Sequence, residues 1–108
     1  MQNKDSLIIK VDDEFIYLNT YNLIYKLNLE NGTLSKSIAL RGMRPYFIAN
    51  EKHLYGIVNN EKRINVYNLD LELIDKIEYN DNYDKVFFNT NGSLIILKHG
   101  RFPNVLVF

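Results

Sequence analysis

The side chains that could perform catalytic or metal chemistry are few and lie far apart in this chain. There are two histidines, His53 and His99, and no cysteine. Without cysteine there is no thiolate nucleophile, no thiolate metal ligand and no disulfide framework. The two histidines fall at opposite ends of predicted strands, so we do not expect them to share a metal ion. An isolated surface histidine is typical of a solvated residue.

Two acidic clusters have the carboxylate oxygens that a hard cation prefers. The first, Asp12-Asp13-Glu14, is better explained as an exposed acidic turn. The second, at residues 80–84, is similar to a calcium loop, but Lys85 occupies the position of its glycine and Asn91 that of its glutamate. We therefore expect no metal and no cofactor.

The length and composition indicate one domain, residues 1–108. A hydrophobic share of 46% is enough for a core. Thirteen Lys plus Arg balance thirteen Asp plus Glu, which excludes the broad basic field of a dedicated nucleic-acid-binding protein. The polar first six residues lack the apolar stretch of an export signal, and no segment has the length of a membrane span. We expect a cytoplasmic protein with neither nucleic-acid nor membrane partners.

The amino-acid types favour strands over helices. Twelve Ile, fourteen Leu, eight Tyr and six Phe accompany fifteen Asn and only two Ala. Branched and aromatic residues favour strands, Asn favours turns, and Ala is the strongest helix former. The composition therefore predicts an all-β fold.

An internal repeat of about 40 residues organises these strands. The apolar triplets Leu7-Ile8-Ile9, Tyr46-Phe47-Ile48 and Val86-Phe87-Phe88 recur at shifts of 39 and 40. The segment that begins at Val11 aligns with the segment that begins at Asn50 at a shift of 39, and the segment 23–30 aligns with 63–70 at a shift of 40. Each repeat therefore predicts four short strands joined by turns.

The predicted strands form consecutive antiparallel hairpins, with Asn31-Gly32 and Asn91-Gly92 as the strongest turn signals. The strands are predicted at 6–11, 14–19, 23–30 and 33–40 in the first unit, 45–50, 53–58, 63–69 and 72–79 in the second, and 85–89, 93–98 and 103–108 in the third.

The pattern of the second unit resembles β-propeller repeats of the YVTN or tryptophan-aspartate type. The residues that carry the resemblance are Pro45-Tyr46-Phe47-Ile48, Leu54-Tyr55-Gly56-Ile57, Arg63-Ile64-Asn65-Val66-Tyr67 and Leu73. It covers nearly the whole chain, but the chain has no Trp, so the Trp-Asp ending is absent. The resemblance implies an incomplete propeller of eleven strands, with blades at about 6–40, 45–79 and 85–108, the last of them unfinished.

Closure of such a propeller requires more than this chain supplies, because closed propellers have about four to eight blades. The third predicted blade also leaves residues 104–108 as an apolar edge, which native proteins avoid exposing. The chain is therefore a piece of a longer propeller, an open arc, or half of an assembly in which two copies supply six blades.

Successive turns of an antiparallel meander lie at opposite ends of the strands, and this separates the loops by charge. One end, which we call the arginine end, collects the loops at 19–22, 41–44, 59–63, 80–84 and 99–102. The other, the acidic end, carries Asp12, Asp13, Glu14, Glu30, Glu51 and Asp70. The predicted ligand-binding or partner-binding residues of the arginine end are Tyr21, Arg41, Arg44, Lys62, Arg63, Tyr83, His99 and Arg101.

Arginine forks and aromatic rings suit a carboxylate, a phosphate or an acidic partner surface. Ordinary solvated turns are the alternative explanation of this sorting. We expect a non-enzymatic propeller-type binding or scaffolding module with a protein partner or anionic ligand. The resemblance implies an alternative, part of a propeller hydrolase or lactonase with a metal in its central channel.

Overall fold

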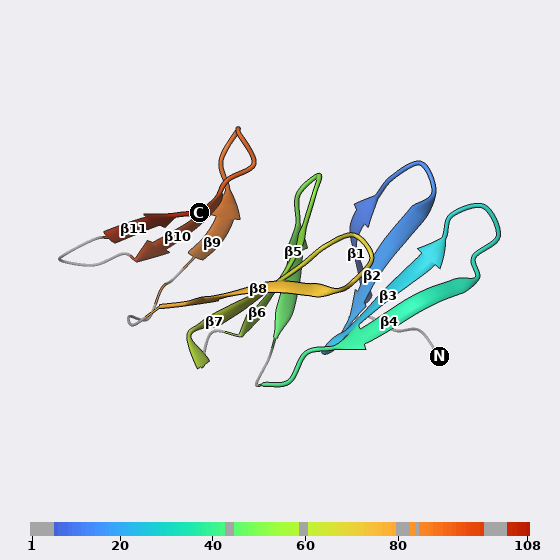
Figure 1. Cartoon of the computed structure of the whole chain (residues 1–108), viewed down its shortest axis with the longest axis horizontal. Coiled ribbons are helices and arrows are strands. Elements are labelled where there is room, and N and C mark those ends of the chain that lie inside the picture. Colours follow the sequence, from blue (N-terminus) through green and yellow to red (C-terminus); the bar gives the residue numbers. More distant parts are fainter. Residues whose placement is uncertain (1–5, 43–44, 59–60, 80–82, 84, 99–103) are drawn as a thin grey trace.

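The computed structural model describes residues 6–42, 45–58, 61–79, 83, 85–98 and 104–108, which form three antiparallel sheets (Figure 1). The first sheet has the order β1-β2-β3-β4, the second β5-β6-β7-β8, and the third β9-β10-β11. The strands are β1 Ser6–Val11, β2 Phe15–Thr20, β3 Leu23–Asn28, β4 Leu34–Ala39, β5 Tyr46–Ala49, β6 Leu54–Val58, β7 Arg63–Tyr67, β8 Leu73–Glu78, β9 Lys85–Phe88, β10 Leu94–Lys98 and β11 Asn104–Val107.

The predicted all-β fold and the sequential pairing of neighbouring strands are confirmed. All eleven strands begin and end within two residues of their predicted positions. The three sheets follow one another along the long axis of the molecule and do not close into a ring (Figure 1). In the described part of the chain, no helix is long and apolar enough to cross a membrane.

One kind of side-chain hydrogen bond shapes the turns of the acidic end and gives a structural role to four of the fifteen asparagines. The carboxamide oxygens of Asn28, Asn50, Asn68 and Asn89 each accept hydrogen bonds from two backbone N–H groups shortly after them, and the Asp12 carboxylate does the same. Such local bonds let Asn and Asp close a turn on their own backbone. The repeat therefore conserves the same turn geometry in all three sheets.

Three of these turns contain a residue in the left-handed region at equivalent places. Gly32, Leu71 and Gly92 have φ values of 71°, 61° and 81°, and each donates its backbone N–H to the carbonyl of the Asn that begins its turn. Glycine takes this conformation freely, which confirms the two predicted Asn-Gly turns. A leucine does not, so a compensating contact must hold Leu71 there.

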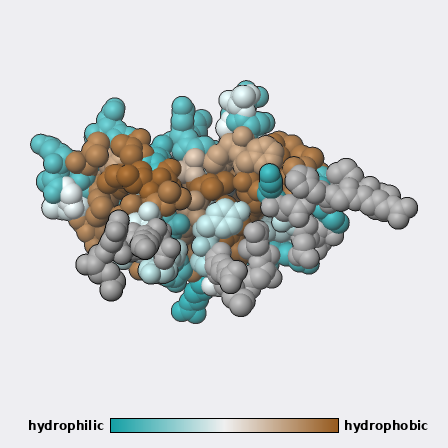
Figure 2. Space-filling model, turned by 180° about the vertical axis from the view of Figure 1, so that it is seen from behind, coloured by the Kyte–Doolittle hydropathy of each residue, from teal (hydrophilic) through white to brown (hydrophobic). Residues whose placement is uncertain are grey.

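Face-to-face packing of the sheets buries the core in two layers. Between the first and second sheets lie Tyr17, Ile24, Leu40, Phe47, Leu54, Val58, Tyr67 and Leu71. Between the second and third sheets lie Tyr55, Ile57, Ile64, Val66, Tyr79, Leu94 and Ile96. The middle sheet is covered on both faces, and all five residues of β6 are buried. Apolar side chains accordingly run across the sheets in Figure 2, with hydrophilic turns along the upper rim.

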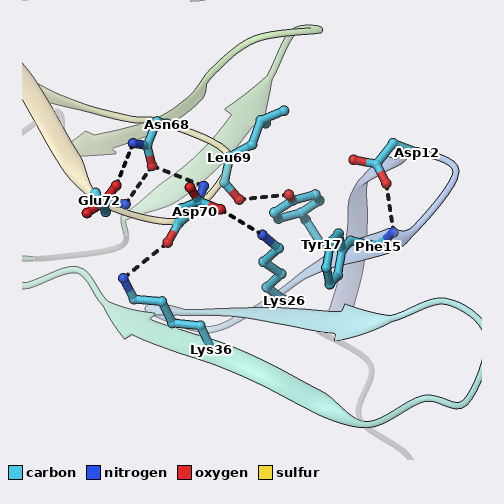
Figure 3. A network of polar contacts seen from close by, with 9 residues as sticks. All are labelled: Asp12, Phe15, Tyr17, Lys26, Lys36, Asn68, Leu69, Asp70 and Glu72. Atoms are coloured by element: carbon cyan, nitrogen blue, oxygen red, sulfur yellow. Dashed lines mark hydrogen bonds and ion pairs between the residues drawn. The ribbon is translucent and has the colours of Figure 1, made fainter.

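The turn between β7 and β8, residues 68–72, joins the first two sheets at the acidic end (Figure 3). The Tyr17 hydroxyl donates a 2.8 Å hydrogen bond to the Leu69 carbonyl, and Lys26 Nζ lies 3.4 Å from Asp70 Oδ1. The same ammonium lies 4.1 Å from the centroid of the Phe15 ring, a favourable cation–π arrangement. Leu71 packs into the core beneath these polar contacts, which is the compensation for its backbone conformation.

We predict that Leu71→Gly destabilises the protein. Relief of the left-handed conformation gains about 1–2 kcal/mol, whereas removal of a buried leucine side chain costs about 2–5 kcal/mol. The cost of the lost burial exceeds the gain from the relieved backbone strain, so the free energy of unfolding in urea should fall. Gly32→Leu is the matched control, since nothing lies within 4 Å of an added Cβ there. That variant should show the backbone cost of about 1–2 kcal/mol with no burial to offset it. A Leu71→Gly protein more stable than the parent would contradict this account.

The buried Tyr17 phenol predicts a pH dependence of stability. Burial, with the nearby charges of Asp12 and Asp70, raises the pKa of Tyr17 from 10.0 to about 12. The unfolded chain therefore loses this proton first, and the stabilisation is complete below pH 10 and disappears as the pH rises to about 12. Tyr17→Phe should lose about 1 kcal/mol at neutral pH, through the missing hydrogen bond. Its unfolding free energy should then fall less steeply than that of the parent in alkaline urea titrations. Parallel curves would contradict the assignment.

Candidate functional site

Strand pairing brings the described loops of the arginine end to the same end of each sheet. In the first sheet Thr20 pairs with Leu23 and Leu23 with Ala39, so the loops that follow β2 and β4 start side by side. In the second sheet Val58, Arg63 and Glu78 form the corresponding row. The third sheet repeats it with Lys98 and Asn104.

Backbone contacts connect these loops to one another. The Leu40 N–H donates a 2.8 Å hydrogen bond to the Asn22 carbonyl, and the Tyr79 N–H donates one of 3.1 Å to the Lys62 carbonyl. Between the first two sheets the approach is tighter still, because a Cβ on Gly42 would collide with Val58. The described loops of the arginine end therefore contact one another.

The cations of this end differ in how far they are available to a ligand. Arg41 is exposed. Arg63 is mostly covered, and its Nη1 lies 3.4 Å from Glu61 Oε1, which offsets its charge. The buried Arg63 Nε has no hydrogen-bond partner. Lys62 is half-buried, with a φ of 53°. The predicted site residues Arg44, His99 and Arg101 lie outside the described residues.

The two predicted aromatic residues have different surroundings. Tyr83 packs edge-on against Tyr79, with ring centroids 5.3 Å apart, and its hydroxyl is 3.5 Å from Asn104 Nδ2. Tyr21 begins the two-residue turn between β2 and β3 and is 66% exposed. Its φ of 54° is uncommon for a bulky residue. Asn19 Nδ2 holds this turn by donating to the carbonyls of Tyr21 and Leu23. Among the described residues of this end, Tyr21 is therefore the aromatic ring most exposed to solvent.

The acidic end contains a hollow that the sequence did not predict. It has a volume of about 670 Å³ and lies between the turns that precede β6 and β10. Its wall includes Asn50, His53, Tyr55, Asn91, Ser93 and Phe108. Asn50 Nδ2 bridges the two turns by donating to the Gly92 carbonyl at 3.0 Å, and it also lies 3.3 Å from the Tyr55 hydroxyl. The sequence shows that both turns begin at an asparagine, Asn50 and Asn89. It does not show how far apart the two turns lie in space, so it could not predict the hollow between them.

His53 is more enclosed than the sequence predicted. The sequence favoured a solvated surface residue, whereas the structure places it half-buried, with its ring edge-on to Tyr55 at 6.1 Å between centroids. The wall of the hollow is mixed, because it also includes Glu51 and Lys52, which carry opposite charges, beside the apolar ring of Phe108.

In the acidic cluster Asp12-Asp13-Glu14, the Asp12 carboxylate accepts hydrogen bonds from the backbone of its own turn. Partial burial acts to raise the pKa of Asp12, but hydrogen bonds from the backbone of Phe15 and Glu14 and the nearby charges of Lys10 and Lys26 together lower the pKa from its ordinary value of 3.8. Across the residues that the structure describes, no three carboxylate or imidazole side chains gather as metal ligands.

No protein-family model matches this chain, and no curated protein sequence matches it.

Proposed function

We propose that this protein is a non-enzymatic binding or scaffolding module of propeller-like sheets, which contacts an acidic protein surface through its arginine end. The contact is centred on Tyr21 and Arg41, on adjacent connections of the first sheet.

The conformation of Tyr21 is the observation that carries this proposal. A non-glycine residue in the left-handed region costs roughly 1–2 kcal/mol. Leu71 offsets this cost by burial, whereas the Tyr21 side chain is 66% exposed. Strained residues with no packing reward are typical of binding and switch sites. The strain presents a large flat ring to a partner.

The neighbouring charge supports an anionic partner. The Leu40 N–H bond to the Asn22 carbonyl places the connection that begins with Leu40 and Arg41 next to the Tyr21 turn. Arg41 is exposed, while Arg63 is offset by Glu61. Arginine and tyrosine are, with tryptophan, the residue types enriched at the energetic centres of protein interfaces. Arginine also pairs with carboxylates through two parallel hydrogen bonds.

A short polyglutamate peptide is the direct probe of this proposal. In two-dimensional NMR titrations, we expect the backbone amide signals of Tyr21, Asn22 and Arg41 to shift. Those of Asn31 and Lys52, at the acidic end, should stay in place. Added salt should weaken the effect, because the contact is exposed.

Two variants and one control make the titration decisive. Arg41→Glu should abolish the shifts, and Tyr21→Gly should weaken them without loss of stability. Lys52→Glu changes charge equally at the opposite end and should bind like the parent. If the peptide shifts no signals, or binds the Arg41→Glu protein as well as the parent, the proposal fails.

A further inference from the structure

Each sheet of the stack has two faces that pack differently. We call the face toward the next sheet along the chain the forward face, and the opposite one the rear face. The forward face of the first sheet meets the rear face of the second, and the forward face of the second meets the rear face of the third. No described residue covers the rear face of the first sheet or the forward face of the third.

The forward face of the third sheet has apolar core positions without a neighbour, together with one charged residue, the exposed Lys85, which pairs with Leu97. Val107 pairs with Ile95 in this sheet, as Val66 pairs with Tyr55 in the second. Val66 is 7% exposed against the third sheet, whereas Val107 is 62% exposed. Phe87, next to Ile95, is also exposed. The same repeat position is therefore interior in one sheet and bare in the other.

The rear face of the first sheet shows the same contrast. Ile8 pairs with Leu18, and the corresponding pair of the second sheet is Phe47 with Gly56. Phe47 is 2% exposed against the first sheet, whereas Ile8 is 56% exposed. Alternation along the strands places no charged side chain on this face, whose described residues are Ser6, Ile8, Val11, Ile16, Leu18, Thr20, Leu23, Tyr25, Leu27, Leu34, Ser37 and Ala39.

A turn of the first sheet also lacks the contact that its counterpart makes. In the second sheet, Leu69 follows Asn68 and packs against the first sheet. The equivalent residue after Asn28 is Leu29, which is exposed. In the second sheet this turn residue packs against the neighbouring sheet, whereas in the first sheet it lies exposed among the described residues.

We propose that a second copy of this chain covers both faces by head-to-tail association. The forward face of the third sheet in each copy packs on the rear face of the first sheet in the other. Within one chain a forward face already packs on a rear face twice. The exposed forward face of the third sheet and the exposed rear face of the first sheet can therefore pack on each other in the same way between two copies. Two copies supply six sheets, within the range of about four to eight that close a ring. A twofold axis makes the two contacts identical.

Light scattering after size exclusion, over a wide range of protein concentration, tests the association. The parent should reach about twice the 12.8 kDa mass of one chain. Val107→Lys and Ile8→Lys each place a charge on one of the two faces, and each should restore the single-chain mass. The matched control is Ile74→Lys, which replaces an exposed aliphatic residue on the outer strand of the middle sheet and should remain a dimer. Thermal unfolding of each variant verifies that it is folded.

Mixing the two variants distinguishes head-to-tail contact from other assemblies. A pair made of one Val107→Lys copy and one Ile8→Lys copy retains one unmodified interface, so the equimolar mixture should recover dimers that neither variant forms alone. A parent protein that stays monomeric at every concentration would overturn the proposal. So would a Val107→Lys variant that still dimerises, which would indicate contact between two copies of the same face, or growth of the parent into open filaments.

Discussion

The middle sheet requires cover on both faces, and this constraint organises the whole molecule. All five residues of β6 and four of the five residues of β7 are buried, and both pleated faces of these strands lose water only when a sheet packs on each side. The first sheet approaches closely enough that a Cβ on Gly56 would lie 2.8 Å from the Leu40 Cδ2 atom. The glycine thus lets the layers meet at van der Waals distance.

Polar contacts at the acidic end fix how the layers sit on one another. Apolar packing is not directional, whereas the Tyr17 bond to the Leu69 carbonyl and the Lys26 contact with Asp70 each require one relative position of two sheets. Asn50, through its bond to the Gly92 carbonyl, does the same between the second and third sheets. The side chains of the acidic end therefore hold the sheets in place. The exposed, strained aromatic residue lies at the arginine end.

The repeat predicted the strands well because each strand is a local pattern of apolar residues bounded by turn residues. It predicted the register between units less well. The sequence aligned the segment from Val11 with the segment from Asn50 at a shift of 39. In the structure Tyr17 pairs with Lys26 and Tyr55 pairs with Val66, so Tyr17 corresponds to Tyr55, a shift of 38. The loop between β6 and β7 is two residues longer than the one between β2 and β3, and this changes the shift within the unit.

Other features depend on contacts between sheets, which no local pattern contains. The burial of Leu71 at a glycine-like backbone position, the half-buried His53 and the hollow beside it all arise where a turn of one sheet meets the next. The sequence grouped Tyr21, Arg41, Lys62, Arg63 and Tyr83 at one end of the strands by counting turns. It could not separate the exposed Tyr21 and Arg41 from the more enclosed Arg63 and Tyr83, because that difference comes from tertiary packing.

Hydrogen–deuterium exchange of the Val107→Lys variant, whose sheets should stack only within one chain, tests the central role of the middle sheet most directly. Amides covered on both faces open only with the whole molecule. We therefore expect the slowest exchange in β6 and β7, with β1 and β11 exchanging much faster. Equal protection across the three sheets, or slowest exchange in the first or third sheet, would contradict the account.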